Sequence, residues 1–178
     1  MAAYSECSFM SKTRLPSSIF LVLALVGAMQ YAYYAPRLPK IVASHFGITG
    51  VVNGWQPKTA FFGVELAMIL LATVISFGVP RLIEAMPISL INVPHKEFWL
   101  GPERREDTLS YIRTWSAWFG CGLLAFLLFV MELAYRANFS TPPQFNNAAF
   151  VPALLAFVIF DTGALGWLIL HFSRTQDH

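Results

Sequence analysis

Residues 111–135 read YIRTWSAWFGCGLLAFLLFVMELAY, and this run of 25 residues contains only two charged side chains, Arg113 and Glu132. A bilayer hydrocarbon core is about 30 Å thick and needs about 20 consecutive, mostly apolar helical residues to cross it. The run meets that requirement. We therefore expect a transmembrane helix over residues 109–135.

Three further stretches have a similar length and composition, namely residues 17–35, 59–79 and 147–172. Pro16 and Pro36 frame the first of these, and Pro80 follows the second. Proline is accepted in the first turn of a helix but disfavours helix in the residue before it, so these positions are expected helix ends. The pattern predicts an all-α integral membrane protein, a four-transmembrane-helix bundle that forms one membrane domain over residues 1–178.

The composition supports this fold class. Of the 178 residues, 56% are hydrophobic and 12% are charged, against about 45–50% and about 25% in soluble domains. The formal net charge is only +2, which leaves no basic surplus for contacts with phosphates. These values exclude a soluble globular enzyme, a disordered chain and a nucleic-acid-binding protein.

The orientation is predicted from the basic residues between the spans. Eight of the twelve Lys and Arg residues lie at the side that holds both termini and residues 80–108, and four lie at the side of residues 36–58. Cytoplasmic loops carry the excess of Lys and Arg. We therefore expect an N-in, C-in protein of the cell (inner, cytoplasmic) membrane, with an outer loop at 36–58 and an inner loop at 80–108.

The first span has two interpretations. Lys12 and Arg14 precede its apolar run, and residues 26–28 (Val-Gly-Ala) could serve as a cleavage site, so a signal peptide is one alternative. The apolar run continues as far as Tyr34, which is longer than a typical signal core. We favour an uncleaved anchor.

The outer loop carries local structural signals. Leu38, Ile41, Val42 and His45–Phe46 recur at roughly helical spacing, which predicts a short amphipathic helix on the membrane surface. Gly47, Gly50 and Asn53–Gly54 are expected to form tight turns. Trp55 and Lys58 are expected to anchor the chain at the headgroup level where it re-enters the membrane.

His45 is the only group in this loop that titrates near neutral pH. We favour a structural histidine that hydrogen-bonds the backbone of a turn. The alternative is a ligand-binding or proton-sensing histidine.

The inner loop is expected to be structured. Pro102 suits the first position of a helix, and Glu103, Glu106 and Asp107 suit its positive end. A helix from Pro102 to Tyr135 would contain 34 residues and measure about 51 Å, so this third helix would extend beyond the bilayer core. Residues 98–100 (Phe-Trp-Leu) would then lie at the membrane surface.

The charges at the start of this helix have two interpretations. The first is a solvated helix start held by salt bridges. The alternative is a docking face for a cytoplasmic partner, formed by Arg104 and Arg105.

Two motifs carry a resemblance. The outer motif comprises Leu38, Pro39, His45, Gly50, Gly54, Trp55 and Lys58, and the inner motif comprises Pro94, Lys96, Trp99, Pro102, Glu103, Arg104 and Arg105. Together they resemble a bacterial membrane family of unknown function whose domain also occurs in SdpI-type toxin-immunity proteins. The resemblance implies a non-catalytic membrane protein that senses or resists an envelope-acting agent through its outer loop.

Three acidic residues lie within the predicted spans: Glu65, Glu132 and Asp161. An ionisable group at the bilayer centre costs about 2.5–3.5 kcal/mol on insertion scales, so each needs an explanation. Glu65 and Glu132 are expected at the same outer level. They either cap loop amides and pair with Lys58 and Arg136, or form with His45 a set of divalent-metal ligands.

Asp161 is expected near or below the middle of the membrane. It is either protonated or hydrogen-bonded to hydroxyl groups such as those of Thr73, Ser76 or Thr162. A proton relay is the alternative, although a relay normally needs several titratable groups in line.

The sequence lacks the motifs of common catalytic sites. It contains no glycine-rich phosphate loop, haem motif or HExxH pattern, so we expect no enzyme, no cofactor and no metal. The first hypothesis is the sensor or immunity protein implied by the resemblance. The second is an accessory subunit among other membrane protein subunits in the lipid bilayer. The third is a proton- or metal-coupled carrier that uses Glu65, Glu132 and Asp161.

Overall fold

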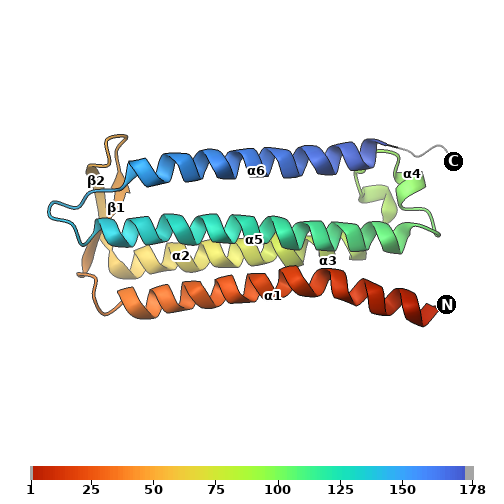
Figure 1. Ribbon diagram of the computed structural model, residues 1–178, viewed down its shortest axis with the longest axis horizontal. Coiled ribbons are helices and arrows are strands. Elements are labelled where there is room, and N and C mark those ends of the chain that lie inside the picture. The colour runs from red at the N-terminus through yellow and green to blue at the C-terminus, as the bar shows by residue number, and fades with distance from the viewer. Residues whose placement is uncertain (1, 175–178) are drawn as a thin grey trace.

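The computed structural model describes residues 2–174, with side chains from Thr13 onward. Four long helical segments run side by side (Figure 1). They are α1 (Ala2–Tyr34), the segment formed by α2 (Lys58–Thr73), a π-turn (Val74–Gly78) and α3 (Val79–Ala85), then α5 (Arg105–Ala137) and α6 (Asn147–Ser173). All four are long and apolar enough to cross a membrane. The prediction of four helices with the length and composition of membrane spans is therefore confirmed.

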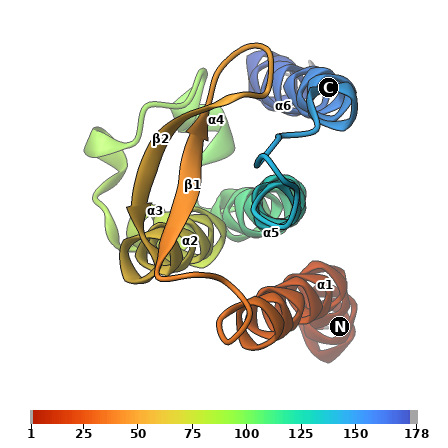
Figure 2. The same cartoon turned by 90° about the vertical axis from the view of Figure 1, so that its left-hand side faces the viewer.

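Helix α5 lies between the other long helices and contacts each of them (Figure 2). Its inward face packs on α1 and α2 through two hydrophobic clusters. One cluster comprises Phe20, Ala72, Cys121, Leu124 and Leu128, and the other comprises Tyr34, Leu38, Val42, Phe61, Met131, Ala134 and Tyr135. Helix α6 packs along α5, through contacts such as the stacked rings of Phe126 and Phe157, whose centroids are 4.3 Å apart.

The second span extends past the proline that was expected to end it. Pro80 lies inside a helical segment of 28 residues, from Lys58 to Ala85. Proline lacks an N–H group and its ring clashes with the carbonyl four residues earlier. The π-turn over Val74–Gly78 widens the helix directly before Pro80. The helix therefore accommodates Pro80 and continues, and the predicted end at residue 79 is wrong.

The first span also starts earlier than predicted, because α1 contains Pro16 in its interior. Figure 1 shows that α1 is bent in its N-terminal part. The last span matches its prediction closely. The side chain of Asn146 accepts a hydrogen bond from the backbone N–H of Ala149 (3.1 Å) and so caps the first turn of α6.

The outer loop forms a β-hairpin, and the expected amphipathic surface helix is wrong. Strand β1 (Ile41–Phe46) pairs antiparallel with β2 (Val52–Pro57). Ile41, Val42 and Val52 are β-branched residues, which fit strands better than helices. Gly50, at φ +79°, supplies the left-handed conformation that the connecting turn needs.

The inner loop contains a 3₁₀ turn (Ile88–Leu90) and one short helix, α4 (Lys96–Trp99). Helix α5 begins at Arg105, so Pro102 and Glu103 lie in the turn before it and the expected start at Pro102 is wrong. The acidic first turn is present as expected, with Glu106 and Asp107. With 33 residues, α5 is about 50 Å long.

Candidate functional site

The hairpin is held against the helices by side chains from distant parts of the chain. Asn138, at the end of α5, accepts a hydrogen bond from the N–H of Ala43 (2.7 Å) and donates one to the carbonyl of Ala43 (2.9 Å). The connecting turn is bound by Gln144, which donates to the carbonyl of Thr49 (3.0 Å). Asn147 on α6 donates to the carbonyl of Ile48 (2.7 Å). The hairpin thus bridges α5 and the start of α6 (Figure 2).

A cavity of about 530 Å³ lies between the hairpin and the ends of α2, α5 and α6. His45 and Gln56 line it from the hairpin, while Phe61, Met68 and Val130 line it from the helices. Its walls are mainly apolar. This size and lining are typical of sites that bind small molecules.

Two residues of the outer motif, Leu38 and Lys58, support the hairpin. Leu38 is buried in the cluster with Val42. The ammonium group of Lys58 donates to the carbonyls of Ala35 (2.7 Å) and Leu38 (3.2 Å), which ties the base of the hairpin to the end of α1. The expected pairing of Lys58 with a carboxylate is therefore replaced by two carbonyl contacts.

The other three side chains of the motif are not buried. Pro39, His45 and Trp55 are exposed, with 56% of Trp55 accessible. His45 Nδ1 lies 3.0 Å from the hydroxyl of Ser44, so the expected hydrogen bond to turn backbone is replaced by a side-chain contact. Gly54 lies within β2 opposite His45, where the ladder is irregular, and does not form the predicted turn.

Glu132 belongs to a polar cluster at the same end of the molecule. It accepts hydrogen bonds from Arg136 (2.6 Å), Tyr34 (2.9 Å) and Gln30 (3.0 Å). The predicted pair of Glu132 and Arg136 is confirmed. The cluster links α1 to α5 and places a satisfied carboxylate within the span.

Glu65 and Glu132 have different hydrogen-bond partners. It accepts a hydrogen bond from the hydroxyl of Tyr135, and the ring of Tyr135 stacks on Tyr34 with centroids 4.3 Å apart. Among the residues that the structure describes, no group of three or more His, Cys, Asp and Glu side chains could hold a metal ion. The alternative metal site of His45, Glu65 and Glu132 is therefore not assembled.

Asp161 does not contact the hydroxyl groups that were expected to bind it. Thr73 donates to Ile69, Ser76 to Ala72 and Thr162 to Val158, so each hydroxyl bonds a carbonyl of its own helix. Asp161 is half-buried on α6. Within residues 13–174 it has neither a hydrogen bond nor an ion pair.

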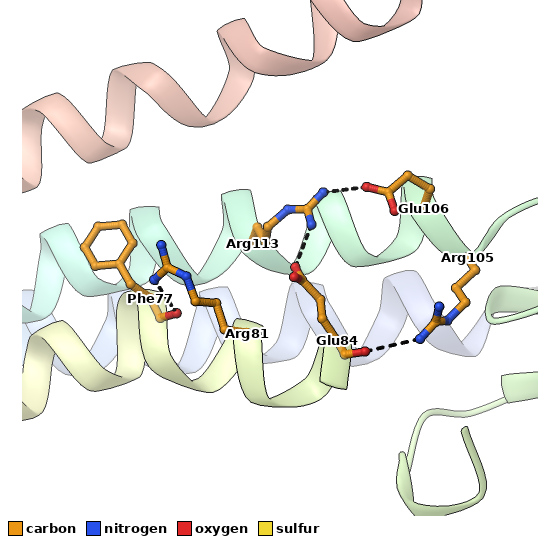
Figure 3. Close-up of polar contacts among 6 residues, drawn as sticks. All are labelled: Phe77, Arg81, Glu84, Arg105, Glu106 and Arg113. Carbon is orange, nitrogen blue, oxygen red and sulfur yellow. Dashed lines mark hydrogen bonds and ion pairs between the residues drawn. The ribbon is translucent and has the colours of Figure 1, made fainter. Parts of the chain in front are cut away.

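The opposite end of the molecule carries a second polar network (Figure 3). Arg113 pairs with Glu84 (2.6 Å) and with Glu106 (2.8 Å). Arg105 donates to the backbone carbonyl of Glu84 (3.2 Å), and Arg81 donates to that of Phe77. The network joins α3 to the start of α5, which agrees with a helix start held by salt bridges.

The two arginines of the expected docking face point to different partners. The guanidinium of Arg104 lies 4.1 Å from the ring centroid of Phe98, whereas Arg105 contacts Glu84. Trp99 donates to the carbonyl of Phe172 at the end of α6 (2.9 Å) and accepts from Thr108 (2.6 Å). Pro94 and Glu103 are exposed, and Lys96 begins α4. Trp99 of the inner motif therefore ties the inner loop to α5 and α6.

The comparisons with known proteins concern the first two spans and the hairpin. Residues 19–77 match a domain of unknown function, DUF1648. The DUF1648 match includes the whole outer motif and ends before the inner motif. It supports the expected resemblance to a family of unknown function. Neither a curated protein nor a solved structure matches the chain.

Proposed function

We propose that this chain is a small, non-catalytic membrane protein that senses or resists an agent acting on the cell envelope, and that the hairpin end is the surface which meets that agent. The observation that carries the proposal is the cavity of about 530 Å³ beneath the hairpin. His45 lies in its wall, and Trp55 is exposed on the neighbouring strand. An apolar cavity with a few polar groups suits an amphipathic ligand.

The proposed orientation is N-in, C-in in the cytoplasmic membrane of a bacterial cell. The excess of Lys and Arg at the opposite end from the hairpin supports it. In this orientation the hairpin faces outward, where it can meet an agent before the agent crosses the bilayer. The immunity-like role itself is supported by the resemblance to SdpI-type proteins.

The test is a survival assay on cells that lack the native gene and express the wild-type or variant chain. Cells are challenged with short cationic amphipathic peptides and with neutral membrane-permeabilising detergents. The wild-type chain should raise the inhibitory concentration of at least one class of agent. The double variant His45→Ala, Trp55→Ala should lose that effect at an equal level of protein in the membrane.

A matched control is Thr49→Ala, because Thr49 is exposed in the same hairpin but does not line the cavity. This variant should behave as the wild-type chain. Equal survival of cells with the wild-type chain and with the double variant would refute the proposed role of the hairpin.

A second candidate is an accessory subunit of a larger membrane complex. The observation that favours it is α6, in which the most apolar window contains no buried residue. Large side chains such as Ile159 and Trp167 are exposed on it. Purification from native membranes in mild detergent tests this candidate, because a particle with further subunits in fixed ratio supports it and a particle of this chain alone contradicts it.

A further inference from the structure

A second cavity opens between α1 and α2, on a different face of α2 from the hairpin cavity. Its volume is about 530 Å³. Small residues create the space, namely Ala24, Gly27 and Ala28 on α1 and Gly63 on α2. A Cβ atom added at Gly63 would meet no atom within 4 Å. We call this cavity the α1–α2 groove.

The groove opens sideways from the molecule. Ala28 and Gly63 at its margin are exposed, and so is Leu66 on the next turn of α2. These residues lie within the two spans, so the opening faces the surrounding lipid. A ligand that enters this groove must therefore partition into the bilayer and carry an apolar body.

The wall of the groove contains one buried acidic side chain, Glu65, of which only 3% is accessible. One carboxylate oxygen, Oε2, accepts the hydroxyl hydrogen of Tyr135. The other, Oε1, is buried and has no hydrogen-bond partner. Within the described residues no Lys, Arg or His side chain contacts Glu65. An unpaired polar atom at this depth is costly unless a partner is supplied.

We propose that the α1–α2 groove binds an amphiphile with a primary ammonium head, and that Glu65 Oε1 accepts a hydrogen bond from that head. The ammonium group supplies both the missing donor and the opposite charge. The rings of Tyr31 and Phe62 also line the groove, packed edge to face with their centroids 4.7 Å apart, and an aromatic ring attracts a cation placed over its face. The alkyl body then lies along the Gly and Ala residues.

The experiment uses the full chain in nanodiscs of phosphatidylcholine. The probe is dodecylammonium with a photoreactive diazirine in its alkyl chain, and the matched probe carries a hydroxyl head on the same chain. After irradiation, labelled peptides are identified by mass spectrometry. The ammonium probe should label the peptides around Tyr31 and Phe62 at a concentration about tenfold lower than the hydroxyl probe needs, since a charge-assisted hydrogen bond is lost with the neutral head.

Two variants localise the contact. Glu65→Gln should reduce labelling by the ammonium probe to the level of the hydroxyl probe. Gly63→Leu should block labelling of the groove by both probes, because its side chain occupies open space in the groove. Val64→Leu is the matched control, since Val64 lines the hairpin cavity and not the groove, and it should be labelled as the wild type is.

Circular dichroism confirms the helical fold of each variant. Equal labelling by the two probes in the wild-type chain would overturn the proposal without any variant. So would undiminished labelling of a folded Glu65→Gln chain. Both outcomes concern the α1–α2 groove and not the hairpin cavity. The labelling experiment can therefore fail while the survival assay succeeds, and the reverse.

Discussion

Substitution of Asn138 by Ala should detach the hairpin from α5. The side chain of Asn138 makes one hydrogen bond with the N–H and one with the carbonyl of Ala43, and Ala43 is fully buried. A buried polar group that loses its partner costs about 1–3 kcal/mol. Two such groups give a loss of about 2–6 kcal/mol in the free energy that holds the hairpin closed.

Amide hydrogen exchange in nanodiscs measures this loss locally, because the exchange of a protected amide reports the free energy of opening. The amide of Ala43 should exchange about 30- to 20,000-fold faster in Asn138→Ala, at tenfold for each 1.4 kcal/mol. Asn138→Asp keeps the acceptor but loses the donor, so the exchange rate of Ala43 in this variant should lie between those of the wild type and Asn138→Ala. Gln144→Ala, which removes an exposed hydrogen bond to Thr49, is the control and should change exchange at Ala43 by less than tenfold. Unchanged protection of Ala43 in Asn138→Ala would show that Asn138 does not hold the hairpin.

Two further substitutions test the packing. Gly120→Ala should destabilise the chain by about 1–3 kcal/mol, because the new Cβ would clash with Ser76 Oγ. Gly63→Ala should be neutral or stabilising in the same denaturant titration. A stable Gly120→Ala chain would contradict the close approach of α5 to the π-turn. Gly50→Ala should destabilise the closed hairpin turn by about 1–2 kcal/mol. The reason is that residue 50 has φ +79° and its new Cβ would approach the carbonyl oxygen of Phe145. Proteolysis at the turn measures this effect, and cleavage no faster than in the wild type would count against it.

The four spans could be predicted because length and hydropathy alone determine them. The hairpin could not, since Leu38, Ile41, Val42 and His45 fit a helical spacing as well as a strand. What decides between the two is the pairing with β2 and the contact with Asn138, which lies 95 residues from Ala43 in the sequence. A single-sequence pattern does not contain this information.

Polar contacts within one helix could be predicted from the sequence, whereas polar contacts between helices could not. The pair of Glu132 and Arg136 is four residues apart on one helix and follows from the sequence. The contact of Glu65 with Tyr135 spans 70 residues and depends on how α2 packs against α5. The role of Tyr135 as a hydrogen-bond donor to an acidic residue within the span was not predicted from the sequence.

The π-turn before Pro80 also sets the direction in which α3 faces. A π-turn contains one residue more than the corresponding α-helical turn, and one residue rotates a helix by about 100°. Glu84 lies beyond that turn and meets Arg113 at the start of α5. Loss of a single residue from Val74–Gly78 would leave α2 in place and turn Glu84 away from Arg113. The extra residue therefore fixes the rotation of α3 relative to α2. The number of residues in this span is constrained as well as their composition.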